Sequence, residues 1–160
     1  MYDPNFVFPD ILTLLRKRAA LHPEAIALED VTSRDLVTYA DLLRRVERMG
    51  RSLRATGGRR IGLVLPNGAQ LSETLLAAAC AGTALPFNPA LTALEFETYF
   101  RDTRIDLVIA RQDVSPMVVR LASQMGLRVL SPVALLHMVV PDVPFDPPAA
   151  QDIAMVLLTS

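Results

Sequence analysis

Residues 60–89 are the stretch that most restricts what this 160-residue chain can fold into. An unbroken apolar run at 61–65 leads into a Pro-Asn-Gly turn at 66–68, a long apolar segment at 71–82 and a second short apolar run at 84–87. An apolar run without alternation predicts a strand covered on both faces, as in a parallel sheet. Small and apolar residues recur through 71–82 at helical spacing. We therefore predict a helix that joins two parallel strands.

The same alternation of strand and helix patterns continues through the rest of the chain. Helices are predicted at 10–22, 39–53, 71–82, 93–102 and 116–125, with a shorter one at 132–138. Strands are predicted at 25–28, 36–38, 61–65, 84–87, 106–110, 128–130 and 153–160, and the first two should form a hairpin. This order predicts an α/β domain with a largely parallel sheet and helices on both faces.

Helical spacing also predicts which residues face the core. The first helix should bury Ile11, Leu14, Leu15 and Ala19, with Arg18 at the rim, and the helix at 39–53 should bury Leu42, Val46, Met49 and Leu53. The helix at 71–82 should bury Leu71, Leu75, Leu76, Ala78, Ala79, Cys80 and Gly82, and Glu73 should face solvent. Asp41 and Glu95 each lie three residues after a threonine, at the spacing of a helix cap, and are expected to serve those caps.

Arginines line the remaining face of the helix at 39–53. They are Arg44, Arg45, Arg48, Arg51 and Arg54. Such a face could bind phosphate or RNA, but there is little aromatic interleaving and the net charge of the chain is −1, so we favour a solvated face and no nucleic-acid partner. Charged residues make up 21% and hydrophobic residues 51%, a balance that excludes a disordered chain.

Cys80 is the only cysteine and lies on an apolar helix face, so we predict a buried structural thiol in a reducing compartment. The first residues have neither the basic nor the apolar region of a signal peptide, and no apolar run approaches the ~18 residues of a membrane span. A cytoplasmic protein without a membrane span is expected.

A search for catalytic motifs finds no zinc pattern, no nucleophile elbow and no complete glycine-rich nucleotide loop. We therefore assign no catalytic and no metal-binding residue. The turn at 66–68 could meet an anion at a helix N-terminus, although simple chain reversal is the favoured role. Residues 141–152 contain four prolines and form an extended connection. The final strand ends in Thr159-Ser160, at the carboxyl end where parallel sheets bind ligands.

Five segments together resemble the N-terminal part of the ATP-dependent adenylate-forming enzymes, which include acyl-CoA synthetases. Residues 37–42 (Val-Thr-Tyr-Ala-Asp-Leu) are similar to an early Thr-Tyr-x-Glu-Leu segment of the family, and residues 61–68 to the strand and turn that follow it. Residues 76–89 and 107–110 resemble the next two motifs. Residues 155–160 (Met-Val-Leu-Leu-Thr-Ser) are similar to the lead-in to the family's phosphate-binding loop. Asp41 and Thr83 depart from the family pattern, where glutamate and glycine are usual.

The resemblance implies that residues 1–160 are an N-terminal fragment of an AMP-binding domain, with the Pro-rich connection 141–152 inside it. The parent would be an acyl-CoA synthetase acting in a setting such as fatty-acid metabolism, which activates a carboxylic acid with ATP and Mg²⁺ and transfers it to CoA. Thr159 and Ser160 would be its cofactor-binding residues in this chain. We expect the fragment to be inactive and without bound cofactor, and its partner to be the rest of the same ligase chain.

Two other hypotheses remain open. The chain could be a non-catalytic binding or dimerisation module derived from the same fold, forming a homo-oligomer through an exposed sheet edge. It could also be a small stand-alone nucleotide-binding domain, although it contains no complete glycine loop.

Overall fold

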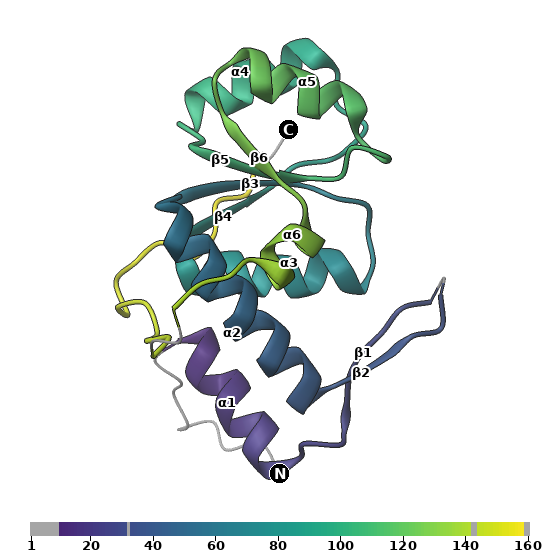
Figure 1. Cartoon of the computed structure of the whole chain (residues 1–160), viewed down its shortest axis with the longest axis vertical. Helices are drawn as coiled ribbons and strands as arrows, with labels where there is room; N and C mark the ends of the chain where they lie inside the picture. The colour runs from purple at the N-terminus through teal and green to yellow at the C-terminus, as the bar shows by residue number, and fades with distance from the viewer. Residues whose placement is uncertain (1–9, 32, 142–143, 159–160) are drawn as a thin grey trace.

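A computed structural model describes residues 10–31, 33–141 and 144–158 of the chain (Figure 1). The helices are α1 (Ile11–Leu21), α2 (Tyr39–Thr56), α3 (Ala69–Ala81), α4 (Ala93–Asp102), α5 (Pro116–Gln124) and α6 (Pro132–His137). The strands are β1 (Ile26–Glu29), β2 (Leu36–Thr38), β3 (Arg60–Val64), β4 (Thr83–Pro86), β5 (Leu107–Ala110) and β6 (Arg128–Leu130). This succession matches the predicted α/β pattern.

Four of the strands form one parallel sheet in the order β4-β3-β5-β6. In the centre, Ile61 of β3 lies opposite Ala84 of β4 on one side and opposite Leu107 of β5 on the other. Parallel neighbours need a crossover connection, and α3, α4 and α5 supply the three that this order requires. Strands β1 and β2 form a separate antiparallel hairpin. Both the parallel sheet and the hairpin are confirmed.

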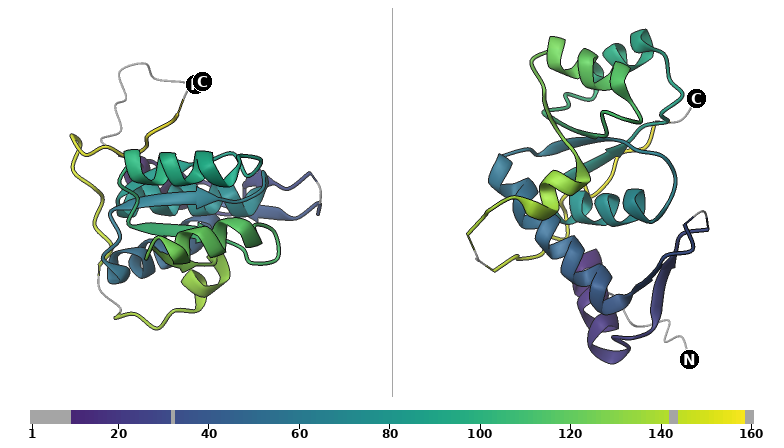
Figure 2. Two further views of the ribbon diagram at one scale, coloured as in Figure 1. Left: turned by 90° about the horizontal axis from the view of Figure 1, so that it is seen from above. Right: turned by 45° about the vertical axis from the view of Figure 1, so that its right-hand side comes forward.

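Helices cover both faces of the sheet (Figure 2). On one face α4 and α5 cover a core that includes Phe96 and Phe100. On the other face α2 and α3 cover a larger, mainly aliphatic core. The side chains of β3 alternate between them, since Leu63 belongs to the aliphatic core and Val64 to the aromatic one. Because both faces of β3 are buried, its sequence is apolar without alternation.

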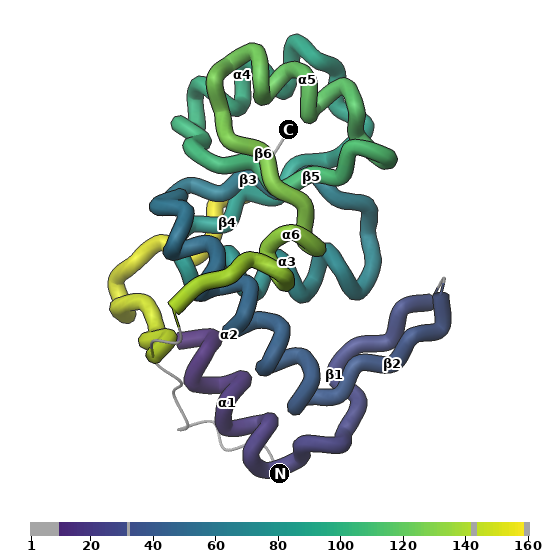
Figure 3. The backbone as a smooth tube through the Cα atoms, in the orientation of Figure 1, coloured from purple at the N-terminus to yellow at the C-terminus, as the bar shows by residue number. Residues whose placement is uncertain are grey.

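Helix α2 is the longest helix on the aliphatic face, and the other helices of that face lie around it (Figure 3). Its predicted inner stripe is confirmed, because Leu42, Val46, Met49 and Leu53 are all buried. The helix ends at Gly57, which adopts a left-handed conformation with φ 76°. Helices α1, α3 and α6 all contact it. In the described part of the chain no helix, including the 18-residue α2, has the length and hydropathy needed to cross a membrane.

Two predicted helix faces are partly wrong. In α1 the buried row is Leu12, Leu15 and Ala19, whereas Leu14 and Arg18 are exposed. The helix packs against both α2 and α3, and this contact turns Leu12 inward. In α3 the buried residues are Glu73, Thr74, Ala77, Ala78, Ala79 and Cys80, whereas Leu71, Leu75 and Leu76 are only half-buried. Helix α3 packs against α2 and against β3 and β4, where small side chains permit close approach.

Candidate functional site

The carboxyl edge of the sheet is the first place to look for a ligand site, because parallel sheets bind ligands there. Strands β3, β4 and β5 end at this edge with Val64, Pro86 and Ala110. The Pro-Asn-Gly turn at 66–68 follows β3, the segment 87–92 follows β4, and a turn that begins at Arg111 follows β5.

The turn at 66–68 meets a carboxylate from the β1–β2 hairpin. The first backbone N–H of α3, on Ala69, donates to Oδ2 of Asp30 at 3.1 Å. A Cβ on Gly68 would lie 2.8 Å from the same oxygen, and Gly68 has a φ of 148°, so the turn requires glycine. Because an acidic side chain already accepts from the first N–H of this helix, the contact favours the chain-reversal role over a bound anion.

Arg111, directly after β5, forms a bidentate pair with Asp113. Its Nε donates to Oδ1 of Asp113 at 3.1 Å and its Nη2 to Oδ2, while Nη1 reaches Oε1 of Gln70 at 3.5 Å. The hydrogen bond lowers the pKa of Asp113 and raises the pKa of Arg111. This pair was not predicted, although the sequence shows an arginine and an aspartate two residues apart directly after a buried strand.

The last described segment runs beside the outer edge of β4. A single parallel bridge joins Met155 to Ala84, with the Ala84 N–H donating to the Ala154 carbonyl at 2.9 Å and the Val156 N–H donating to the Ala84 carbonyl at 3.0 Å. The direction of the predicted strand 153–160 is therefore correct, but its extent is wrong. The predicted site residues Thr159 and Ser160 lie outside the described residues.

Pro86 explains why the pairing stops at one bridge. The N–H groups of Thr83 and Phe87 point toward β3, where they donate to the carbonyls of Arg59 and Leu63. Alternation therefore turns Ala84 and Pro86 toward the outer edge. Pro86 has no N–H to donate, so the ladder loses its next bond.

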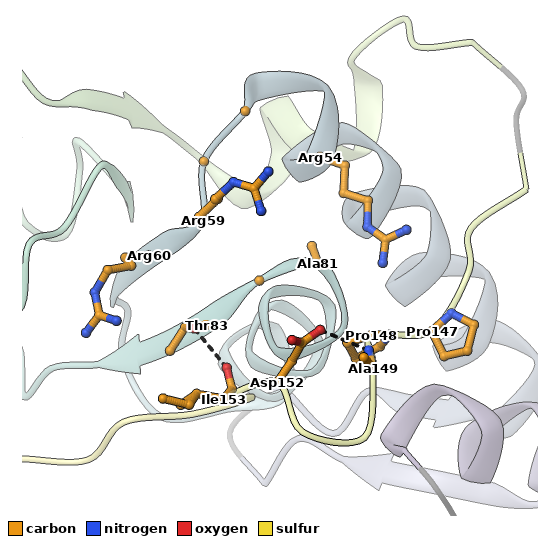
Figure 4. A pocket seen from close by; sticks show the side chains of 13 residues that line it. Arg54, Arg59, Arg60, Ala81, Thr83, Pro147, Pro148, Ala149, Asp152 and Ile153 are labelled. Atoms are coloured by element: carbon orange, nitrogen blue, oxygen red, sulfur yellow. Dashed lines mark hydrogen bonds between the residues drawn. The ribbon is translucent and has the colours of Figure 1, made fainter.

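An open hollow of about 670 Å³ lies at the opposite, amino edge of the sheet (Figure 4). Arg54 and Arg59 reach over it, and Arg60 lines its rim. Arg54 donates to the carbonyls of Cys80 and Asp146, at 3.0 and 2.7 Å, and Nε of Arg60 donates to the carbonyl of Thr103. Two of the three guanidinium groups are thus committed to backbone carbonyls, so this hollow is not a built anion site.

The prediction of a solvated arginine face holds for Arg44 and Arg54, which are exposed, whereas Arg45, Arg48 and Arg51 are half-buried and bonded to other groups. Arg45 pairs with Glu73 at 2.6 Å. Arg48 donates to the carbonyls of Leu136 and Met138, at 3.1 and 2.9 Å. Arg51 pairs with Glu47 at 3.5 Å, and Arg54 donates to carbonyls as described above. The Arg44 side chain is 71% exposed and pairs with Asp41 of the same helix.

Glu73 was predicted to face solvent and instead is only 5% exposed. The prediction failed because α2 packs directly over this side of α3 and supplies the partner guanidinium of Arg45. A buried carboxylate is tolerated where a cation pairs with it. Glu73 is therefore part of the α2–α3 contact.

Cys80 is fully buried, as predicted for a structural thiol. Burial is the main cause that raises its pKa from 9.0 to about 11, so the thiolate is strongly disfavoured. Within the described ranges, no three His, Cys, Asp or Glu residues come together in a way that could hold a metal ion.

Comparison with known proteins identifies the family. The family model of the AMP-binding enzymes matches residues 15–160. The chain belongs to the AMP-binding enzyme family. The feruloyl-CoA synthases of an Amycolatopsis species and of a Streptomyces species are each 31% identical to it over 148 residues. That alignment covers 90% of this chain but only 29% of each relative, so the chain spans less than a third of their length.

Solved structures of AMP-binding enzymes and related ligases have the same fold. The N-terminal domain of FACL13 from Mycobacterium tuberculosis superimposes with a TM-score of 0.81 at 24% identity, over 94% of this chain and 42% of that one. The O-succinylbenzoate coenzyme A synthetase MenE from Bacillus subtilis, in complex with ATP and a magnesium ion, gives a TM-score of 0.69 at 20% identity, over 82% of this chain and 35% of that one. The four-stranded sheet and its helices therefore match the N-terminal domain of acyl-CoA synthetase-like ligases.

Proposed function

We propose that this chain forms the N-terminal part of an acid–thiol ligase of the AMP-binding family. The parent would activate a carboxylic acid with ATP as an acyl-adenylate and transfer the acyl group to CoA. The observation that carries the proposal is the parallel bridge between Met155 and Ala84. It directs the chain toward the carboxyl edge of the sheet, which is where a nucleotide would bind in such a fold.

Within this proposal the hydroxyl groups of Thr159 and Ser160 contact the phosphates of ATP. Hydroxyl and loop N–H groups suit phosphate oxygens, because they donate hydrogen bonds to charge that develops during the reaction. Magnesium would neutralise the triphosphate. Its protein ligands would come from the rest of the parent ligase, since the described residues hold no suitable cluster of His, Cys, Asp or Glu.

The substrate class to test first is an aromatic carboxylic acid. The two curated relatives are both named feruloyl-CoA synthase. Fatty acids are the next class, because the solved neighbours include a Mycobacterium tuberculosis fatty acyl CoA synthetase. ATP and CoA are abundant in the cytoplasm, and a location there is expected. Cell fractionation with an antibody to the chain would test it.

Residues 1–160 should not catalyse the reaction alone. ATP–pyrophosphate exchange with ferulate and with fatty acids should stay at background for the isolated chain, because a nucleotide site needs more donors than Thr159 and Ser160 can supply. Exchange well above background would contradict this expectation.

A chimera would test the ligase role itself. Residues 15–160 would replace the aligned part of the Amycolatopsis feruloyl-CoA synthase, and feruloyl-CoA formation would be measured. We expect the chimera to make feruloyl-CoA, at a reduced rate because the contacts with the rest of the ligase come from a protein only 31% identical. A chimera that matches the parent enzyme in thermal melting and gel filtration, yet forms no feruloyl-adenylate, would refute the proposal.

A non-catalytic binding or dimerisation module is the second candidate. One observation favours it: Ile153 and Leu157, beside the edge strand β4, are 60% and 64% exposed. Exposed apolar side chains next to an open sheet edge favour association. Light scattering of the isolated chain should then give the mass of a homo-oligomer, and a monomer at all concentrations would exclude this form of the module.

A further inference from the structure

Phe145 holds the Pro-rich connection against α2, and we call the place on α2 where its ring packs, at Gly50, the seat. We call residues 144–152 the strap. The Phe145 side chain is 2% exposed and belongs to the aliphatic core. Its ring lies directly against Gly50, where an added Cβ would come within 2.2 Å of the ring atom Cζ. Only glycine at position 50 leaves room for the ring.

Two arginines, Arg16 and Arg54, also bind the strap at or next to Phe145. Nη2 of Arg16, on α1, donates to the Phe145 carbonyl at 2.6 Å, and Arg16 is itself held by Glu47 of α2. The guanidinium of Arg54 lies 4.3 Å from the centre of the Phe145 ring and donates to the Asp146 carbonyl at 2.7 Å. The strap is therefore fixed at one point by an apolar contact, a cation–π contact and two hydrogen bonds.

The chain beyond the strap is held far more lightly. The strap closes with a turn in which the Ala149 N–H donates to Asp152 Oδ2 at 2.9 Å. After it, the Thr83 hydroxyl donates to the Ile153 carbonyl at 2.8 Å (Figure 4), and the single bridge at Ala84 follows. Pro86 contributes no further N–H. A strand held by so few bonds can slip in register, and a slip of one residue moves it by roughly 3.3 Å.

We propose that Phe145 is a positioning residue: its seat on Gly50 sets the register of residues 153–158 against β4. Resting on the proposed ligase function, the same anchor sets how residues 153–158 approach the carboxyl edge of the sheet, where ATP would bind. The anchor lies eight residues before Ile153, and the strap between them, with Pro147 and Pro148, is stiff enough to transmit its position.

Hydrogen exchange in the isolated chain tests the anchor without reference to catalysis. Phe145→Ala should lower the protection of the Ala84 and Val156 amides, which form the bridge, by roughly tenfold relative to the Phe87 amide in the β3–β4 ladder. Val118→Ala is the matched control, because Val118 is equally buried on the other face of the sheet. It should change all three amides by one common factor.

A milder pair of variants covers the case in which Phe145→Ala fails to fold. Arg16→Gln removes the bond to the Phe145 carbonyl, and Arg18→Gln changes an exposed arginine of the same helix. We expect Arg16→Gln to lower the protection of the two bridge amides selectively, by about threefold, and Arg18→Gln to leave them unchanged. If the amides of Ala84, Val156 and Phe87 fall by the same factor in the Phe145 or the Arg16 variant, the register proposal is overturned.

Kinetics of the chimera then test the positioning role. There Phe145→Ala should lower kcat/KM for ATP by about 10- to 100-fold, since small misplacements of a reacting group are costly, and should leave the KM for ferulate unchanged. Phe145→Leu, which refills most of the seat, should restore much of the loss. A KM for ferulate that rises as much as the KM for ATP would indicate general destabilisation and would overturn the positioning role. An inactive wild-type chimera would count against the ligase function alone, because the hydrogen-exchange result stands independently.

Discussion

The two faces of the sheet are held to their helices by different kinds of contact. On the α4–α5 face the contact is aromatic: Phe87, Phe96, Tyr99 and Phe100 surround one another, and the rings of Phe87 and Phe100 meet edge to face at 5.3 Å. These four residues lie within 14 positions of the sequence. The face is therefore assembled mainly by apolar burial of residues close in sequence, to which Arg60 adds a bond to the Thr103 carbonyl.

On the α2–α3 face, directional polar contacts add to the apolar core. The Ser52 hydroxyl donates to the Leu135 carbonyl at 2.7 Å, and Arg48 donates to two further carbonyls of the same region. Arg16 reaches the Phe145 carbonyl, 129 positions away in the sequence. The Leu135 carbonyl, which would otherwise be buried without a donor, is thereby satisfied. The difference indicates that apolar contacts supply most of the stability, while arginine and serine donors decide which distant segment lies where.

The largest expected effect is the loss of an aromatic ring. Phe100→Ala should destabilise the fold by about 3–5 kcal/mol, because it removes a fully buried ring and leaves a cavity. Urea denaturation would measure it. Leu94→Ala on the same helix is the control, since Leu94 is 73% exposed and its loss should cost no more than about 0.5 kcal/mol. A loss below about 1 kcal/mol for Phe100→Ala would break the comparison, since the aromatic face would then not depend on its rings.

The pH dependence of stability tests the packing of the α2–α3 face, because Cys80 lies in its core. Its folded pKa of about 11 lies above the ordinary value of 9.0, so the unfolded chain loses the proton first as the pH rises. The stabilisation is thus complete below pH 9 and is lost as the pH approaches 11. Over that interval wild type should lose up to about 2–3 kcal/mol relative to Cys80→Ala, by urea denaturation. Parallel pH profiles for the two proteins would show that the thiol is not buried as described.

A buried polar donor should matter less than a ring. Ser52→Ala leaves the Leu135 carbonyl without its donor and should cost about 1–3 kcal/mol in urea denaturation. Ser123→Ala is the matched control: its hydroxyl donates to the Val119 carbonyl on the exposed side of α5, and its removal should stay within about 0.5 kcal/mol of wild type. If the two variants behave alike, the hydroxyl of Ser52 does not join α2 to α6, and the described contrast between the faces would be weakened.

Sequence reasoning succeeded where the signal lies within one element. The apolar run at 61–65 predicted the central strand, and the spacing of Leu42, Val46, Met49 and Leu53 predicted the inner face of α2. The capping box of Thr92 and Glu95 is also confirmed. Each of these three predictions depends either on neighbours three or four positions away or on the burial of one strand. A single sequence shows both kinds of pattern.

It failed where a side chain finds its partner far along the chain. Glu73 and Arg45 read as solvent-facing because nothing near either one indicates that α2 packs over α3. Arg48 and Arg54 bond to carbonyls, and every residue has a carbonyl, so no residue type marks the acceptor. The short pairing at Met155 is a different case, because the sequence did contain a signal for it. Pro86 lies in an edge strand and has no N–H to donate, so it could have predicted that the ladder ends there.

The smallest expected effect returns to the aromatic face, at the cap of α4. Thr92→Ala should cost about 1 kcal/mol, because the Thr92 hydroxyl accepts the Glu95 N–H. The Thr92 N–H and hydroxyl in turn donate to the Glu95 carboxylate and lower its pKa below the ordinary value of 4.5. A lowered folded pKa gives stability that is present above pH 4.5 and lost as the pH falls through the folded value, so the advantage of wild type over Thr92→Ala should shrink in acid.

Urea denaturation at neutral pH and near pH 3 would measure this difference, with Thr98→Ala as the control. The Thr98 hydroxyl bonds to the Leu94 carbonyl inside the same helix and touches no carboxylate, so its small effect should not depend on pH. A Thr92→Ala penalty that stays constant into acid would mean that the bond from the Thr92 hydroxyl to the Glu95 carboxylate adds nothing to the cap. The threonine would then act only by accepting the Glu95 N–H, and the polar contribution to the α4 face would be smaller still than on the α2–α3 face.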